Sequence, residues 1–181
     1  MAPLHYAAYE GNAAAIRMLV AAGAEVDVRD EDTFPMGAGC TPLFYAMSSG
    51  HYDASSALLE LGADIYGASL SAPPITHYVA AGHYMEDVDS IKILHLLLEN
   101  GCDVNRLAGG RHFSLFGTSM LFCASFYGKL ESVRLLLEHR ANPMQVCGEG
   151  AHQGRTPLSA ARDQMHWSIV ALLEDAANRA D

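Results

Sequence analysis

The apolar residues of this chain recur at the spacing of short amphipathic helices that come in pairs. Leu43, Ala46 and Met47 fall on one face of a first helix, which ends before Gly50. A second helix follows, and its apolar face is carried in different parts of the chain by Ile16, Leu19 and Val20, by Leu58 and Leu59, or by Val133, Leu136 and Leu137. The pattern indicates paired short helices along the whole chain.

The same pattern occurs five times. The copies are "APLHYAAYEG" from Ala2, "TPLFYAMSSG" from Thr41, "PPITHYVAAG" from Pro73, "SMLFCASFYG" from Ser119 and "TPLSAARDQM" from Thr156. A second shared segment follows each copy and reads "GAEVD" at Gly23, "GADIY" at Gly62, "GCDVN" at Gly101, "RANPM" at Arg140 and "AANRA" at Ala177. Such self-similarity is typical of a repeat protein.

The residues at the ends of the predicted helices suit those positions. Thr41 and Thr156 are each followed by proline, so a hydroxyl that can accept an orphan backbone N–H precedes a residue that the first helical turn tolerates. Gly50 stands where the first helix needs a left-handed residue to end. The glycine of the second shared segment ends the second helix in the same way and starts a projecting loop.

These residues resemble the ankyrin repeat, whose period is about 33 residues and whose signature is T-P-L-H-x-A. The resemblance covers essentially the whole chain. It implies an all-α solenoid of five helix-turn-helix repeats with β-hairpin-like fingers, forming a single domain over residues 1–181. In the family the signature histidine, here His5, ties one finger to the next, so we expect a structural role for it. The expected repeats span approximately residues 1–35, 36–67, 68–113, 114–150 and 151–181.

The two ends of the predicted stack differ from its middle. One unit alone cannot bury its apolar face, so end repeats of a solenoid need a polar outer surface. The fifth copy has Glu174, followed by Asp175, where the second helices of the others have Val20, Leu59, Leu98 and Leu137, which predicts a C-terminal cap. The chain begins inside a repeat. We therefore expect either a shortened first repeat or a regulatory or structural fragment of a larger chain, bound to another domain of that chain.

The spacing of the copies is irregular, and extra residues in solenoids map to loops and often to the binding face. The copies begin at residues 2, 41, 73, 119 and 156, so the intervals are 39, 32, 46 and 37 residues. The first and third fingers, Ala24–Cys40 and Cys102–Thr118, are long, and the second, Ala63–Ala72, is short. Two long fingers around a short one predict a notch over the second and third repeats.

The walls of this notch differ in chemistry. The first finger is acidic, with Asp27 and Asp30 among its carboxylates, and it carries Phe34 near its tip. The third finger ends in a basic and aromatic stretch that includes Arg111 and Phe113. We expect Phe34, Arg111 and Phe113 to contact a partner. The alternative is that the finger aromatics fold back and cover the edge of the stack.

The resemblance also implies a contact surface on the concave face, which the first helices line. Its variable positions are Tyr9, Glu10, Ser48, Ser49, Ala80, Ala81, Phe126, Tyr127, Asp163 and Gln164. Large rigid aromatic side chains dominate binding energy, so the aromatics are candidate anchors. The small residues in the middle are expected to leave room for a segment of a ligand. The alternative is that the aromatics are exposed without a binding role.

Composition narrows the classes of partner. Half of the residues are hydrophobic and 18% are charged, which is typical of a folded chain. The net charge of −10, with Lys92 and Lys129 as the only lysines, argues against nucleic acid, because its affinity comes largely from neutralised phosphates. No apolar run is long enough for a membrane span, and the N-terminus lacks the pattern of a secretory signal. Four separate cysteines indicate reduced thiols and an intracellular (cytoplasmic or nuclear) location.

The sequence contains no motif for nucleophilic, phosphate-transfer or zinc chemistry, and its nine histidines share no ligand spacing. Residues 83–89 hold Glu86, Asp87 and Asp89 in the turn between the third repeat's helices. They do not match a calcium loop, since a ligand position and the glycine are missing. We expect a solvated loop or an extra helical turn there. A metal-dependent enzyme that uses this insertion is the alternative.

One candidate modification site follows from the resemblance. The segment "LLLENGCDVN" resembles the site that asparaginyl hydroxylases modify in ankyrin repeats, and it places Asn105 as the target. The alternative is that Asn105 satisfies the backbone of its finger.

Together these observations predict a monomeric, non-catalytic scaffold that recognises another protein or peptide. We expect no cofactor, no metal, no nucleic acid and no membrane among its partners.

Overall fold

A computed structural model describes residues 1–30, 39–67, 74–82, 87–109 and 116–179, with the side chain of residue 87 excepted. This part of the chain forms ten α-helices. They are α1 (Pro3–Tyr9), α2 (Ala13–Ala21), α3 (Pro42–Ser48), α4 (Tyr52–Glu60), α5 (Ile75–Ala81), α6 (Asp87–Glu99), α7 (Met120–Phe126), α8 (Leu130–Glu138), α9 (Pro157–Asp163) and α10 (Trp167–Asn178).

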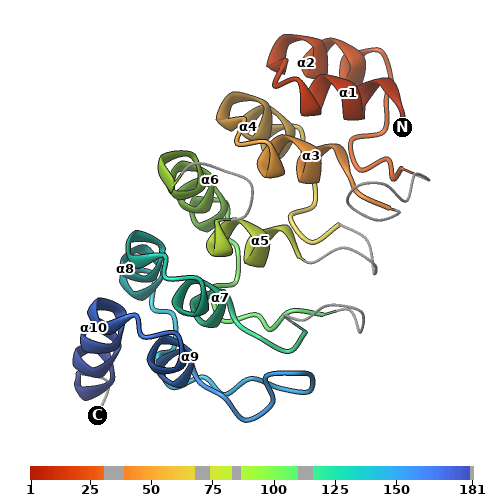
Figure 1. The fold of residues 1–181 in the computed structure, drawn as a ribbon. Helices are drawn as coiled ribbons and strands as arrows, with labels where there is room; N and C mark the ends of the chain where they lie inside the picture. Colours follow the sequence, from red (N-terminus) through yellow and green to blue (C-terminus); the bar gives the residue numbers. More distant parts are fainter. Residues whose placement is uncertain (31–38, 68–73, 83–86, 110–115, 180–181) are drawn as a thin grey trace.

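The helices form five antiparallel pairs that stack into an arc (Figure 1). The odd-numbered helices make an inner row next to the projecting loops, and the even-numbered helices make an outer row. Each inner helix packs on the next inner helix, and each outer helix packs on the next outer one. The all-α repeat architecture predicted from the sequence is therefore confirmed, and the described ranges contain no β-strand.

The predicted helix caps are present. The hydroxyls of Thr41, Ser119 and Thr156 accept the backbone N–H of the residue three positions later, at 3.4, 3.1 and 3.2 Å respectively. This bond satisfies one of the donors that a helix start leaves unpaired. Gly50 has φ +76°, as a left-handed helix end requires.

The third repeat differs from the sequence alignment by one residue. Aligned on its glycine, Pro74 matches Pro42, the first residue of α3, yet α5 begins at Ile75 and Pro74 is its N-cap with an extended backbone. This start places His77 at the third helical position, which His5 occupies in α1. The helix still ends at a left-handed residue, Gly82, with φ +64°.

One hydrophobic core runs through the stack from α1 to α10. The predicted apolar faces supply it, with Ile16, Leu58, Val133 and Leu136 fully buried. Their neighbours toward the edge of each outer helix are half-buried. Replacing one such leucine by alanine typically costs about 2–5 kcal/mol.

The outer helix of the fifth repeat is polar where the sequence predicts it. Glu174 is exposed and accepts a hydrogen bond from Arg162 at 2.5 Å. Asp175 is exposed and pairs with Arg179, also at 2.5 Å. Both pairs lie at the surface, where an ion pair contributes at most about 1 kcal/mol.

Candidate partner-binding surface

The projecting loops are tied to one another by a ladder of equivalent hydrogen bonds. Four residues after the start of the second shared segment, Asp27, Tyr66 and Asn105 each accept a backbone N–H from the next repeat. The donors are Asp64 at 3.1 Å, Asp103 at 2.7 Å and Asn142 at 2.8 Å. A carboxylate, a phenol and an amide thus perform the same task. The ladder fixes the spacing of successive loops.

Two buried histidines add a second set of ties. His5 Nδ1 accepts the backbone N–H of Ala2 at 3.0 Å, so its Nε2 carries the hydrogen and donates to the carbonyl of Cys40 at 3.1 Å. His77 Nε2 donates to the carbonyl of Thr118 at 2.9 Å, which is the same bond two repeats later. Burial lowers the pKa of His77 to about 4. The structural role expected for His5 therefore extends to His77.

Sequence alignment missed the role of His77 because it was anchored on the glycine. Aligned on the histidine instead, "PITH" at residues 74–77 matches "APLH" at residues 2–5.

Reciprocal backbone hydrogen bonds close the base of three loops. They join Asp30 with Gly39 and Cys40, Ala108 with Gly117 and Thr118, and Cys147 with Gly154 and Arg155. A further bond from Gly148 N to Gly117 O, at 2.8 Å, links the third loop to the fourth.

The acidic wall expected on the first finger needs correction at Asp30. This carboxylate is buried and accepts hydrogen bonds from the backbone of Gly39 and Cys40 and from the hydroxyl of Tyr45. A buried carboxylate requires such donors, and Asp30 has them from within its own loop and from α3. Asp27 is half-buried, and its pKa is raised chiefly by desolvation. Asp30 therefore offers no free charge to a partner.

Several predicted contact residues lie outside the described residues. Phe34, Arg111 and Phe113 are among them, so the notch and its aromatic contacts stay predictions. The same holds for Glu86 and the side chain of Asp87 in the acidic insertion. Asp89 is described, and its carboxylate lies 3.7 Å from the ammonium of Lys92. Among the described residues of the acidic insertion, there is thus no set of ligands for the alternative of a metal-dependent enzyme.

The first end of the concave face presents exposed aromatic surface. The side chain of Tyr9 is 54% exposed and its ring lies edge-on to Tyr45, with centroids 6.5 Å apart. Glu10 is exposed beside it. The backbone beneath is held by His51, whose Nε2 lies 2.8 Å from the carbonyl of Tyr9. Tyr9 and Glu10 therefore stand on a fixed part of the stack.

The middle of the concave face differs from the expectation. Ser48, Ala80 and Ala81 are buried, so they offer no surface to a partner, and Ser49 is half-buried. The reason is visible at Ala81, where the half-buried ring of Tyr127 packs against Ala81 and Cys123. The room that the small residues leave is filled by a side chain of the next repeat.

The other end of the concave face carries a cluster that we call the aromatic–arginine patch, formed by Phe126, Tyr127, His152, Arg155 and Asp163. The Phe126 ring lies 5.1 Å from the ring of Tyr127 and 5.4 Å from that of His152. Phe126 and Tyr127 are half-buried, while Asp163 and its neighbour Gln164 are exposed.

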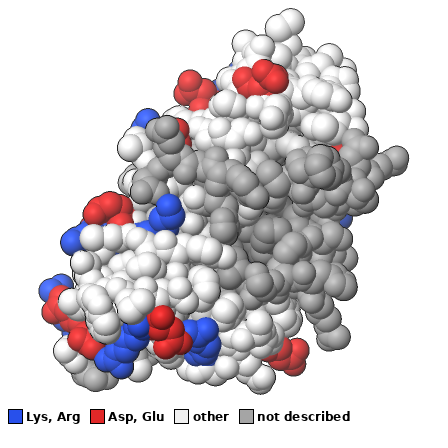
Figure 2. All heavy atoms as spheres, viewed as in Figure 1, with Lys and Arg blue, Asp and Glu red and all other residues white. Residues whose placement is uncertain are grey.

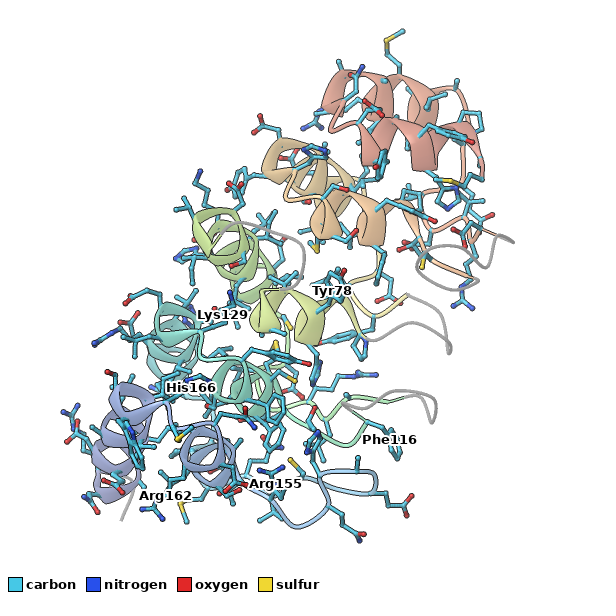
Figure 3. All side chains as sticks on the ribbon, viewed as in Figure 1. Tyr78, Phe116, Lys129, Arg155, Arg162 and His166 are labelled. Atoms are coloured by element: carbon cyan, nitrogen blue, oxygen red, sulfur yellow. The ribbon has the colours of Figure 1, made fainter. Side chains whose placement is uncertain are left out.

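Arg155 is the charged centre of this patch. Its guanidinium lies 3.2 Å from His152 Nδ1, forms an ion pair with Asp163 and stands 5.9 Å from the Phe122 ring. Burial first, and then the charge of Arg155, lower the pKa of His152. Figure 3 shows Arg155 beside α9, on the side of the loops. His152 and Arg155 were not predicted from the sequence. The one feature that could have indicated them is that they lie just before Thr156, the cap of the fifth repeat's first helix.

Asn105 uses its side chain fully within the loop ladder. Its Oδ1 accepts from Asn142 N, its Nδ2 donates to the carbonyl of Arg140 at 3.3 Å, and its backbone carbonyl accepts from Gln145 at 2.7 Å. These hydrogen bonds support the alternative that Asn105 serves to pair backbone groups of the loops. Hydroxylation of Asn105 stays a prediction.

The environments of the cysteines do not favour nucleophilic chemistry. Cys40, Cys102, Cys123 and Cys147 are buried thiols, and burial raises their pKa, to about 12 for Cys40 and Cys123. A raised pKa disfavours the reactive thiolate. Within the described ranges, no three histidine, cysteine or acidic residues come together as metal ligands. Nor does any described helix have the length and apolarity to cross a membrane.

Comparison with known proteins agrees with this architecture. A family model described as ankyrin repeats (three copies) matches residues 1–68 and 77–180. Ankyrin repeat and SOCS box protein 5 of Mus musculus is 30% identical over 146 residues, which is 80% of this chain and 38% of that protein. Protein phosphatase 1 regulatory subunit 27 of Homo sapiens is 42% identical over 64 residues, which is 35% of this chain and 38% of that protein. The chain thus spans well under half the length of these relatives. It belongs to the ankyrin repeat family.

Proposed function

We propose that this chain is a non-catalytic module that binds another protein or peptide through its concave face. The observation that carries the proposal is the aromatic–arginine patch, where the half-buried Phe126 ring contacts Tyr127 and His152, and His152 lies beside the Arg155 guanidinium. Aromatic and arginine side chains are enriched among the residues that dominate protein–protein binding. Tyr9 and Glu10 form a second contact area at the other end of the face. Because the middle of the face is filled, the partner reaches both ends without entering the stack.

The stack supports this role by holding the contact residues in place before the partner arrives. The loop ladder and the histidine ties restrict each loop relative to the next. Binding to such a surface loses little ordering entropy, which leaves more of the contact energy for affinity.

The finer parts of the proposal concern the loops and the setting. The loops act as β-hairpin-like fingers, and Phe34, Arg111 and Phe113 extend the contact surface beyond the concave face. The module is a single domain and a monomer, it works inside the cell as a scaffold, and it needs no cofactor, nucleic acid or membrane.

The names of the relatives favour a regulatory setting. One of them is by name a regulatory subunit of a phosphatase, and another carries a further box beside its repeats. We therefore propose as a second candidate function that this chain is the regulatory or structural part of a larger polypeptide. Its partner would then be another domain of that polypeptide.

The test compares partner capture by variants at and away from the concave face. Tyr9→Ala and Arg155→Gln alter the two ends of the concave face, and Met18→Ala alters an exposed residue of α2 on the outer row. Proteins captured by the immobilised wild-type chain are identified by mass spectrometry, and the affinity of each for the three variants is measured. We expect a loss of about tenfold or more for the concave variants and none for Met18→Ala. Equal affinity for all three variants contradicts the proposal.

A further inference from the structure

A groove lies between the ends of the last two outer helices. It has a volume of about 640 Å³ and is bounded by α8, by the turn that follows it and by the second half of α10. Its side chains include Arg134, Leu137, Arg140, Leu172, Ala176 and Arg179. This groove belongs to the outer row and is separate from the concave face.

The floor of the groove is apolar. Leu137, Leu172 and Ala176 are half-buried, and Ala141 and Pro143 are buried beneath the turn. Half-buried aliphatic side chains between two helices leave apolar area that a ligand can cover. Each apolar side chain placed there gains the free energy of removing its surface from water.

The rim of the groove is arginine-rich. Arg134 lies 3.5 Å from Glu131 and Arg179 lies 2.5 Å from Asp175. Glu138 also lines the groove. Among the residues that the structure describes, the guanidinium of Arg140 has no carboxylate partner. It is therefore available to an acidic group from outside.

Arg140 also occupies a position that favours glycine. Its φ is +65°, in the left-handed region, whereas the equivalent residues Gly23, Gly62 and Gly101 have φ values of +95°, +90° and +80°. Side chains other than glycine are disfavoured there, so this arginine is held at a cost to the fold. A strained residue with a free charge over an apolar floor is a reason to look for a ligand.

The charge of the chain favours this groove over the rest of the surface for an anionic partner. Residues 1–128 contain 14 acidic and 5 basic side chains, and residues 129–181 contain 7 and 6, which gives net charges of −9 and −1. Most Lys and Arg atoms on the face in Figure 2 lie at the lower left, near α8, α9 and α10, with Asp and Glu atoms among them. An acidic segment is thus repelled less by the last two repeats than by the first three.

We propose that this groove binds an acidic peptide segment of a partner protein, with a carboxylate paired to Arg140 and an aliphatic or aromatic side chain on the floor. Bidentate pairing of a carboxylate by guanidinium gives the segment its orientation. The site lies on the outer row and acts independently of the concave face.

The proposal is tested by peptide selection on the whole chain. A phage-displayed library of random peptides is selected on immobilised wild-type protein, without any selection against the variants. We expect the recovered peptides to combine Asp or Glu with Leu or Phe. Fluorescence anisotropy then measures the Kd of each labelled peptide, which we expect to rise about tenfold or more in Arg140→Gly and to rise with salt.

Arg140→Gly separates binding from folding. Glycine suits the left-handed backbone, so we expect its melting temperature to equal or exceed that of the wild type while binding is lost. Arg134→Gln is a second groove variant, and Arg17→Gln is the matched exposed control on α2. Tyr9→Ala and Arg155→Gln, which test the concave face, should leave the Kd of these peptides unchanged.

Three outcomes overturn the proposal. They are a selection without acidic peptides, a Kd unchanged by Arg140→Gly, and a Kd raised by Tyr9→Ala or Arg155→Gln, because that last result places the peptides on the concave face.

Discussion

His77 donates a hydrogen bond from Nε2 to the carbonyl of Thr118, which lies 41 residues further along the chain. The hydroxyl of Thr76 lies 3.0 Å from the other ring nitrogen, Nδ1, which accepts because the ring is neutral. The imidazole is buried and holds the third repeat to the loop that enters the fourth. This contact has a consequence for stability against acid.

We expect protonation of His77 to make the fold less stable in mild acid. Its pKa is about 4 in the folded chain, against 6.5 for a histidine in water, so between these values the unfolded chain binds one more proton. The contribution is therefore fully present above pH 6.5 and is lost as the pH falls toward 4, with a limiting slope of about 1.4 kcal/mol per pH unit.

The measurement is the free energy of unfolding in urea at several values of pH. His77→Gln keeps a donor for Thr118 but does not titrate. Its free energy should fall less steeply than that of the wild type between about pH 6.5 and 5, where most carboxylates remain ionised. Parallel curves for the two proteins would show that His77 does not titrate in this way.

Gly117→Ala should strongly destabilise the stack. An added Cβ would lie 2.1 Å from the carbonyl oxygen of Glu149, and φ is +72°. The backbone of the neighbouring loop cannot swing aside as a flexible side chain can, so we expect a loss of about 3 kcal/mol or more. Gly23→Ala is the matched control, because φ is +95° and nothing lies within 4 Å of its added Cβ.

Gly23→Ala has only the cost of placing alanine in a left-handed backbone conformation, so we expect it to lose about 1–2 kcal/mol of stability. Melting temperatures of the two variants then show how much the clash with Glu149 adds in Gly117→Ala. Equal melting temperatures would mean that the third and fourth loops do not approach each other as described.

Asn105→Ala should remove one step of the loop ladder. The backbone N–H of Asn142 loses its acceptor, and we expect a loss of about 1–2 kcal/mol in the free energy of unfolding. Asn105→Asp retains an acceptor and serves as the control. A loss as large for Asn105→Asp as for Asn105→Ala would argue against this role.

Hydroxylation of Asn105 is tested separately. The folded chain is incubated with an asparaginyl hydroxylase and digested for mass spectrometry, which would show one added oxygen atom at this residue. Because the side chain is engaged in the ladder, we expect the modification to be faster in a variant such as Gln145→Ala, which loosens the same loop. Absence of the added oxygen in both proteins rules out the site in vitro.

The finger aromatics give a further prediction. If Phe34 and Phe113 contact a partner, replacing both by alanine weakens partner binding more than it lowers the melting temperature. The opposite pattern, a large drop in melting temperature with little change in affinity, would show that they cover the stack. Calorimetry and a binding titration on the same protein separate the two.

The repeated architecture could be predicted from the sequence because each repeat carries its helix-capping and apolar residues within its own short segment. Thr41, Thr156 and Gly50 have side chains or backbone freedom suited to one helical position, so their roles follow from their immediate neighbours. The same local reasoning found the buried positions of Ile16 and Leu136.

Which residues of the candidate site are exposed to solvent could not be predicted from the pattern within a single repeat. Ala81 is buried because Tyr127 of the next repeat covers it, and Asp30 is buried because α3 supplies the hydroxyl of Tyr45. Such contacts join residues many positions apart, and periodicity within one repeat carries no information about them. Arg155 was missed for the same reason, since the Phe122 ring beneath its guanidinium belongs to the preceding repeat.

The hydrogen bonds of the loop ladder are regularly spaced along the chain, although the copies of the repeat are not. Each rung joins residues 37 positions apart, although the inner-helix copies are spaced by 39, 32 and 46 residues over the same region. The second rung encloses the short second finger and the insertion between α5 and α6, and their combined length equals that of the long finger that each of the other two rungs encloses. Loop-closure entropy depends on the number of residues enclosed, so every rung closes against the same entropic penalty. The chain can therefore vary in length inside a repeat without making any one junction the weak point at which the stack separates.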